Sequence, residues 1–136
     1  MQNKNVHGLY NLEVKGRFII TTGYGAWNME CALMFGDDMK RIIESFDSQP
    51  WGGILDIRKW ELSPPECWTE FNEQREFWIT QNYQVEAIVY NSKVQEGVAK
   101  KKRYRPGELN TFEFDDYDEA FSFCTKEAKK LSIPIG

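Results

Sequence analysis

The chain has 136 residues, of which 41% are hydrophobic and 28% are charged, and its formal net charge is −4. These values are typical of a globular chain, and its length suits one domain spanning residues 1–136 with a core of its own. The acidic balance argues against a surface built to bind nucleic acid throughout, because such domains are normally basic.

The predicted elements begin with a β-hairpin. Apolar and polar residues alternate over residues 10–14, which is typical of a half-buried strand. Residues 15–17, Lys-Gly-Arg, predict a tight turn. Residues 18–21 predict a second strand, which Gly23 and Gly25 end.

A helix and a central strand follow the hairpin. Asn28 is a suitable N-cap for a helix whose apolar residues recur at helical spacing from Cys31 to Phe46. Residues 54–57, Ile-Leu-Asp-Ile, predict a short strand buried on both faces. We place Asp56 at the end of this strand.

The rest of the chain alternates between helices and strands. A second helix is predicted from about 64 to 81 and a strand over 85–90, and the basic residues 92–105 predict a short helix and a loop. A last strand contains Phe112 and Phe114, and a final helix has acidic residues at its start and lysines at its end, as the helix dipole favours. The order β-β-α-β-α-β-(α)-β-α predicts an α/β fold with a mixed sheet of about five strands.

Three cysteines, Cys31, Cys67 and Cys124, fall in the predicted helices. Their odd number and wide spacing favour buried thiols in a reducing compartment over a disulfide framework. The sequence has no apolar run of signal-peptide length at its start and none near the roughly 20 residues that span a bilayer. We therefore expect a cytoplasmic protein, with peripheral contact at the inner face of the membrane as an open alternative.

Three segments carry a resemblance to a known family. They are HGLYNLEVKGRFIITTGYGAWNMECA (7–32), PWGGILDIRKWELSPPE (50–66) and FEFDDYDEAFSF (112–123). In order and spacing they resemble the SpoIIAA-like (STAS) domain of anti-sigma-factor antagonists, and more closely the bacterial single-domain proteins described as STAS/SEC14-like. The resemblance implies a non-catalytic role: binding a partner protein, a small ligand or, as in SEC14 and CRAL-TRIO folds, a lipid.

Anti-sigma-factor antagonists carry an Asp-Ser pair after the central strand, and its Ser, at the helix start, is phosphorylated. Asp56 matches the strand-end Asp of that pattern, the pair itself is absent, and Ser63 stands near the place of the phosphorylated residue. Ser63 followed by Pro64, Pro65 and Glu66 also matches a capping box. We expect capping at Ser63 and keep phosphorylation as the alternative.

The expected ligand site lies after the central strand, because ligands of open α/β sheets bind beyond the carboxyl ends of the strands. We predict that Trp27, Trp60 and Trp68 wall an apolar pocket there, with Asp56 beside them and Trp60 on a polar loop. The alternative is that the three tryptophans only cover the edge of the core. An apolar small molecule or a lipid is the expected ligand.

The segment KKKRYR, residues 100–105, is the sharpest charge feature. Contact with anionic lipid head groups is predicted for its five basic residues, Lys100, Lys101, Lys102, Arg103 and Arg105. The alternative is a solvated segment. A single interleaved aromatic residue, Tyr104, is too few for base stacking, so nucleic acid is not an expected partner.

The sequence offers little for catalysis. His7 is the only histidine, and the motifs of zinc sites and serine hydrolases are absent. We therefore expect no cofactor, no metal site and no enzyme activity. A small hydrolase built on Asp56, Glu61 and Glu66 is the alternative ranked last.

The function predicted from the sequence is that of a ligand-binding or regulatory module which takes an apolar or lipid ligand and associates peripherally with an anionic membrane. The alternative is a protein-interaction switch of the anti-sigma-antagonist kind. A homodimer through a sheet edge or a tryptophan patch stays open.

Overall fold

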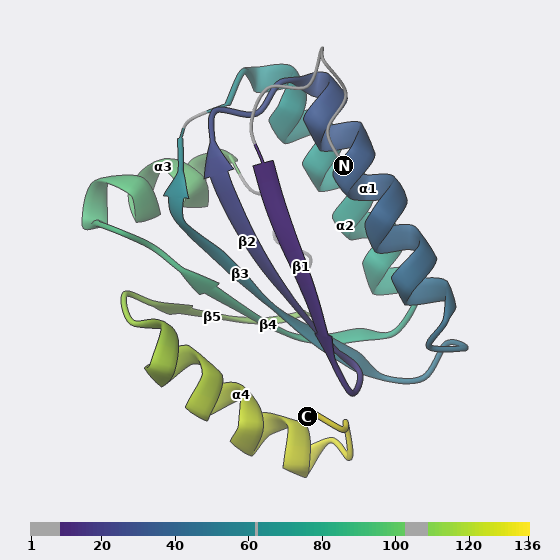
Figure 1. The fold of residues 1–136 in the computed structure, drawn as a ribbon. Helices are drawn as coiled ribbons and strands as arrows, with labels where there is room; N and C mark the ends of the chain where they lie inside the picture. Colours follow the sequence, from purple (N-terminus) through teal and green to yellow (C-terminus); the bar gives the residue numbers. More distant parts are fainter. Residues whose placement is uncertain (1–8, 62, 103–108) are drawn as a thin grey trace.

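The computed structural model describes residues 9–61, 63–102 and 109–136. Five strands form one sheet, and helices pack on both of its faces (Figure 1). In chain order the elements are β1 (Leu9–Lys15), β2 (Phe18–Gly25), α1 (Met29–Glu44), β3 (Trp51–Trp60), α2 (Pro65–Thr80), β4 (Tyr83–Val89), α3 (Lys93–Lys102), β5 (Asn110–Phe114) and α4 (Tyr117–Lys130).

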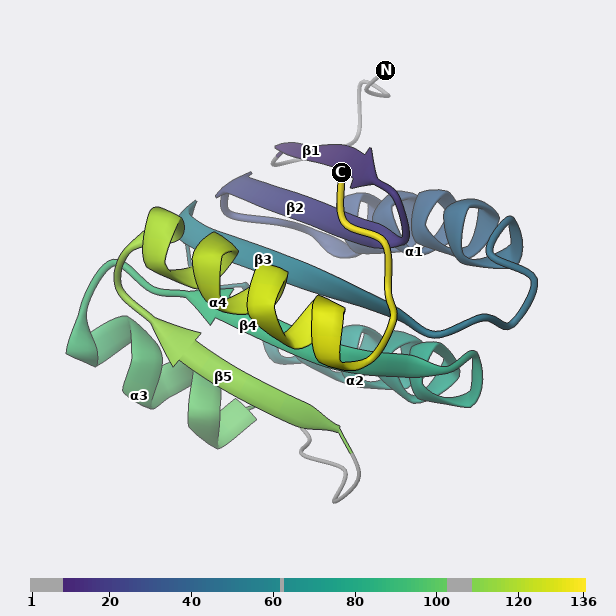
Figure 2. The same ribbon diagram turned by 90° about the horizontal axis from the view of Figure 1, so that it is seen from below.

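The strands stand in the sheet in the order β1-β2-β3-β4-β5. The β1–β2 pair is antiparallel and the other three pairs are parallel, which confirms the predicted mixed sheet of about five strands. Helix α4 covers one face, and α1 and α2 cover the opposite face (Figure 2). Helix α3 contributes Ala99 to the core on the α1/α2 face, so the three helices that connect parallel strands share that face.

Alternating side chains along the strands divide the core into two layers. The layer beneath α4 joins small helix residues such as Ala120 and Cys124 to the aliphatic side chains of Ile54 and Val85. The layer beneath α1 and α2 is larger and rich in aromatic rings. All five tryptophans therefore lie on one face of the sheet, together with most of the other buried aromatic rings.

Two predicted strand ends are wrong. Strand β2 continues through Gly23 to Gly25, and β3 continues past Asp56 to Trp60. The two strands stay paired there, since Tyr24 is opposite Lys59 and Gly25 is opposite Trp60. Ladder hydrogen bonds join backbone groups, so pairing extends beyond the apolar run from which the prediction was made.

The predicted N-cap of α1 is confirmed, because the Asn28 side chain accepts a hydrogen bond of 3.0 Å from the Cys31 N–H. The predicted capping box of α2 is wrong. Pro64 occupies the N-cap position and α2 has no side-chain cap. The helix starts one residue later than the capping box requires, so Ser63 lies outside it. The Ser63 hydroxyl is buried and has no hydrogen-bond partner among the described residues.

An ion pair, which the sequence analysis did not identify, lies inside the aromatic layer. Arg75 of α2 is 2% exposed and Glu86 of β4 is fully buried. Arg75 donates to both carboxylate oxygens of Glu86, at 3.1 Å from Nε and 2.6 Å from Nη2. Tyr83 and Thr111 donate their hydroxyls to the same carboxylate at 3.0 and 3.1 Å. Burial raises the pKa of Tyr83, which keeps its hydroxyl protonated as a donor. The carboxylate therefore ties α2, β4 and β5 together.

We predict that Arg75→Met lowers the free energy of unfolding by about 3–5 kcal/mol, because it leaves the buried Glu86 carboxylate without its counter-charge. The double variant Arg75→Met/Glu86→Leu removes both charges and is expected to recover most of that loss. Urea denaturation of the single and double variants measures both values. A loss below about 1 kcal/mol in Arg75→Met, the size typical of a surface pair, would contradict a structural role for the pair.

Candidate functional site

An apolar cavity of about 50 Å³ lies between the sheet and helices α2 and α3; it is called the tryptophan cavity below. Strands β2, β3 and β4 contribute to its lining on the sheet side, and Ala99 of α3 lines it from the helix side. Its aromatic walls are Trp27, Trp60, Trp68 and Phe71. The structure thus brings together the three tryptophans that were predicted to wall a pocket.

Trp60 reaches this cavity because β3 contains a β-bulge. Thr22 pairs with Asp56, but Tyr24 pairs with Lys59, so two steps along β2 match three along β3. The extra residue reverses the alternation of side chains beyond it, which is how a bulge re-aims a side chain. Trp60 is therefore the last residue of β3 and packs with the aromatic layer, rather than lying on a polar loop as predicted.

The three tryptophans form a continuous wall. The ring centroids of Trp27 and Trp60 are 6.0 Å apart, and those of Trp60 and Trp68 are 5.1 Å apart, both in edge-to-face geometry. Phe71 contacts all three rings. Such offset contacts hold aromatic rings in defined orientations. The wall belongs to the core as well as to the cavity, and its role in binding stays a prediction.

Two buried polar atoms of cavity-lining residues have no hydrogen-bond partner in the described part of the chain. They are the Thr21 hydroxyl oxygen and the Trp60 indole Nε1. The indoles of Trp27 and Trp51, by contrast, donate to the backbone oxygens of Leu9 and Gln81 at 3.0 and 2.9 Å. An unpaired buried polar group costs about 1–3 kcal/mol, so native structures rarely keep one without a reason.

A larger hollow of about 300 Å³ lies against the tryptophan cavity, beside α3; it is called the α3 groove below. Both spaces are lined by Ile57, Trp60, Trp68 and Ala99, so they share a wall. The α3 groove lies past the carboxyl ends of β3 and β4, where open α/β sheets bind their ligands. The location predicted for a site is therefore hollow in the structure.

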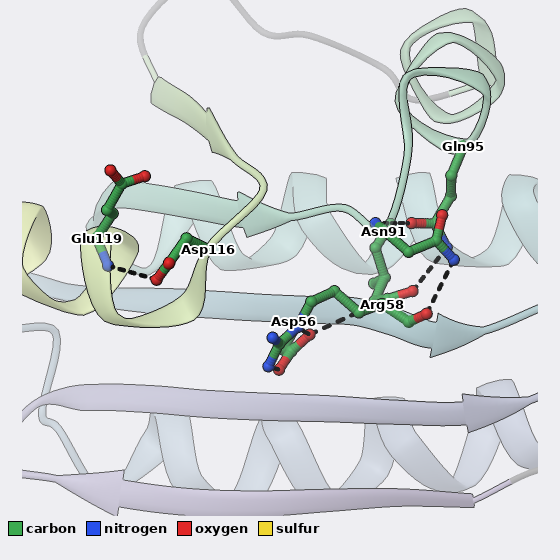
Figure 3. A network of polar contacts seen from close by, with 7 residues as sticks. Asp56, Arg58, Asn91, Gln95, Asp116 and Glu119 are labelled. Atoms are coloured by element: carbon green, nitrogen blue, oxygen red, sulfur yellow. Dashed lines mark hydrogen bonds and ion pairs between the residues drawn. The ribbon is translucent and has the colours of Figure 1, made fainter.

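Helix α3 is fastened over the groove by two amide side chains at its N-terminal end. Gln95 donates to the backbone oxygens of Ile57 and Trp60 at 2.6 and 3.1 Å. Its Oε1 accepts from the Asn91 N–H at 2.8 Å, and the Asn91 side chain donates to the Arg58 oxygen at 2.9 Å. Figure 3 shows Asn91 and Gln95 beside Arg58 near the end of β3. These bonds therefore couple the position of α3 to the end of strand β3.

Asp56 lies away from the tryptophans, although both were predicted to line one site. Its side chain lines a separate hollow with Tyr117 of α4, on the opposite face of the sheet. Arg58 binds both of its carboxylate oxygens, at 2.9 and 2.8 Å. Glu61 lines the α3 groove instead, so the acidic residues of the suggested hydrolase do not share a cavity.

The described residues offer no other reactive cluster. Among them, no group of three His, Cys, Asp or Glu side chains is placed to hold a metal ion. The three cysteines are buried in helices, as predicted. Burial raises the pKa of Cys31 to about 11 and that of Cys124 to about 12, which keeps both thiols protonated at neutral pH.

The basic segment is only partly described. Lys100 of α3 bridges two carboxylates, with its Nζ 2.8 Å from Glu96 and 3.3 Å from Glu113. Lys101 is exposed. Lys102 is the last residue of α3, and Arg103 and Arg105 lie outside the described residues. The charge of Lys100 is thus compensated, and the predicted membrane contact stays a prediction. Within the described ranges, no helix is long and apolar enough to cross a membrane.

Apart from the three tryptophans, the sequence analysis assigned none of the residues that line the tryptophan cavity to a site. Three of those it missed are Thr21, Gly23 and Arg75. Two of them carried a signal. A glycine inside a strand pattern often marks a bulge or a close approach, which applies to Gly23. Arg75 follows Trp68 by seven residues and therefore shares its helix face. Nothing in the sequence singled out Thr21 from the other residues of its strand.

Several solved structures resemble this fold, and two of them are an informative pair. One is an uncharacterised protein from the DUF3478 family with a SpoIIAA-like fold, from Shewanella loihica PV-4. It has a TM-score of 0.67 and 10% sequence identity, and the match covers 90% of this chain and 98% of that one. The other is an anti-sigma factor antagonist from Mycobacterium paratuberculosis, with a TM-score of 0.55, 12% identity and coverage of 86% and 93%.

No protein-family model matches the sequence, and no curated protein is similar enough in sequence to count as a relative. At identities this low, structural similarity establishes the fold alone. The predicted SpoIIAA-like fold is confirmed, with its mixed five-stranded sheet and helices on both faces.

We predict that Gly23→Ala raises the free energy of unfolding by about 0.5–1 kcal/mol, because alanine loses less backbone entropy on folding than glycine. Its Cβ would lie 3.6 Å from Trp27 and Trp60, in ordinary contact, and would take up part of the tryptophan cavity. Urea denaturation measures the change.

Gly52→Ala is the matched control on the neighbouring strand. Its Cβ would lie 2.5 Å from the Phe18 ring, so this variant is expected to be less stable than the wild-type protein. A Gly23→Ala variant destabilised as much as Gly52→Ala would show that the cavity does not have room for a methyl group.

Proposed function

We propose that this chain is a non-catalytic regulatory module that acts by binding a small apolar ligand in the tryptophan cavity and the adjoining α3 groove. The observation that carries the proposal is the cavity walled by three tryptophans at the carboxyl ends of the parallel strands, which shares a wall with the larger α3 groove. Apolar walls with a few convergent polar groups are typical of small-molecule sites.

The absence of a reactive arrangement among the described residues supports a role in binding. Asp56 is held by Arg58 in a two-bond pair, and Glu86 is held by Arg75. These contacts engage the two buried carboxylates of the described chain. Similarity to an anti-sigma factor antagonist supports regulation, since that protein acts on a regulatory factor by name.

The size of the hollow space favours a small molecule over a long-chain lipid. The tryptophan cavity measures about 50 Å³ and the α3 groove about 300 Å³. Pockets for drug-sized ligands span ~300–1,000 Å³, so the groove lies at the lower limit of that range. A two-chain lipid would need a space that the described residues do not enclose.

A second candidate function is a protein-interaction switch, and the similarity to the anti-sigma factor antagonist favours it. The suggested phosphorylation site is less favoured, because the Ser63 hydroxyl is buried before the start of α2. A kinase would reach it only after this segment opens. Contact with anionic membranes has less support still, since Lys100 is already bound to Glu96 and Glu113.

A thermal-shift screen of the full chain against a panel of neutral fragments with one aromatic ring tests the proposal. Fragments that bind only the folded state raise the midpoint temperature by mass action. We expect a subset to raise the midpoint of the wild-type protein and to have no effect on Gly23→Ala, whose added methyl group occupies the cavity.

Gly97→Ala serves as the control variant, because Gly97 lies on α3 and, apart from its own helix backbone and chain neighbours, no atom of the described residues lies within 4 Å of its Cβ position. It is expected to respond to the fragments as the wild-type protein does. A panel without any hits, or with hits that Gly23→Ala retains in full, would contradict binding in the tryptophan cavity and would move the protein-interaction switch to first place.

A further inference from the structure

We infer that this chain forms a homodimer in which the free edge of β1 pairs antiparallel with the same edge of a second copy, about a two-fold axis at Leu12. The inference goes beyond the proposed function, because the interface lies at the edge of the sheet and not at the tryptophan cavity. Three features of β1 lead to it: its unpaired side, its regular geometry with exposed apolar residues, and a sequence that is complementary to itself.

One long side of β1 has no partner strand among the described residues. β1 is at the end of the strand order, so β2 is its only neighbour in the described sheet (Figure 2). An edge strand presents a row of backbone N–H and C=O groups, which is a template for a further strand. The opposite edge strand, β5, has five residues against the seven of β1, and its Glu113 is bound by Lys100. Short, charged edges discourage pairing, so β1 is the edge better suited to a partner.

β1 lacks the features that commonly protect an edge strand. Natural edges are protected by proline, by bulges or by charges that repel a second strand. β1 contains no proline, and its register with β2 is continuous from one end of the strand to the other, without a bulge. Its two charged residues, Glu13 and Lys15, form an ion pair with each other at 3.6 Å. The strand therefore carries no net charge that would repel a second copy.

β1 also exposes apolar side chains on both faces of the sheet. Leu9 is 50% exposed and Val14 is 46% exposed. Successive residues of a strand point to opposite faces, so these two side chains lie on different faces of the sheet. A helix packed on one face would cover only one of them. A strand added along the edge places neighbours beside both, so a strand is the partner that fits.

Full overlap of the two strands fixes their register. Two antiparallel copies of a seven-residue strand pair along their whole length only when the central residue, Leu12, lies on the two-fold axis opposite its copy. Tyr10 then lies opposite Val14 of the second copy, and the symmetry repeats this pair on the other side of the axis. Aromatic and β-branched side chains opposite each other stabilise antiparallel strands. The pair also covers the exposed side chain of Val14.

The charges of β1 favour the same register. Asn11 lies opposite Glu13 of the second copy, and Leu9 lies opposite Lys15, whose aliphatic stem packs against an apolar side chain. No like charges are then directly opposite each other. An axis at Glu13 would set two carboxylates opposite each other, which destabilises a strand pair. An axis at Asn11 would leave Val14 and Lys15 with no β1 residue opposite them.

Sedimentation equilibrium of the full chain tests the inference, and we expect twice the monomer mass of 16.0 kDa. Val14→Lys places a lysine on the edge, as natural edge strands do, and removes two Tyr10–Val14 pairs from each dimer. We expect it to raise the dissociation constant of the dimer at least about tenfold. Leu33→Lys is the matched control, because Leu33 is also 46% exposed but lies on α1. It is expected to leave the dimer unchanged, and circular dichroism confirms that both variants are folded.

Engineered cysteines test the register. Asn11 and Glu13 are both exposed, and each lies opposite the other in the inferred dimer. An equal mixture of Asn11→Cys and Glu13→Cys, oxidised with copper phenanthroline, is expected to form a disulfide-linked dimer faster than either variant alone. The wild-type protein is the blank, because its three cysteines are at most 2% exposed.

A mass that stays at 16.0 kDa up to about 100 µM protein would overturn the inference and leave the proposed function standing. A dimer that Leu33→Lys weakens as much as Val14→Lys would also overturn it, because its interface would not lie at β1. Cross-linking of Asn11→Cys alone or Glu13→Cys alone as fast as in the mixture would overturn the inferred register.

Discussion

The buried ion pair between Arg75 and Glu86 is the constraint on which the candidate site depends. Its four hydrogen bonds join α2 to the two strands at one edge of the sheet, and they fix where α2 lies over the sheet. Trp68 and Phe71 stand on the same side of α2, toward the preceding turns, so their rings are placed by the same anchor. The pair also makes the polar part of the cavity wall electrically neutral.

The backbone geometry of β2 and β3 also shapes the candidate site. The bulge in β3 turns Trp60 toward the helices, and the glycine at position 23 leaves space beside it where a side chain would otherwise stand. Gln95 then holds α3 over the end of β3 through backbone oxygens, so the groove is bounded by a helix fixed at one end. The Arg75–Glu86 ion pair fixes α2, and the Gln95 hydrogen bonds fix α3. Together they leave a hollow with apolar walls at the carboxyl edge of the sheet.

Apolar periodicity predicted the fold, because helix stripes and buried strands leave a direct pattern in the sequence. The rule that ligands of open α/β sheets bind beyond the carboxyl ends of the strands, rather than periodicity, led to the grouping of the three distant tryptophans, which do meet in the structure. Periodicity has a limit. It failed where backbone pairing decides the outcome. The bulge that orients Trp60 and the late start of α2 at Pro65 have no apolar signature. The sequence analysis did not identify the Arg75–Glu86 ion pair, because the two residues lie on different elements and meet only in the fold.

The most direct measurement of the central claim, ligand binding in the tryptophan cavity, is the indole N–H region of a ¹H–¹⁵N spectrum recorded with and without a saturating fragment from the thermal-shift panel. Trp51 serves as the internal reference, because its indole already donates to the Gln81 backbone oxygen and it does not line the cavity. We predict that the Trp60 signal moves when the cavity is filled, while the Trp51 signal stays nearly in place. A Trp60 signal that stays in place at saturation would contradict binding of the fragment in the tryptophan cavity.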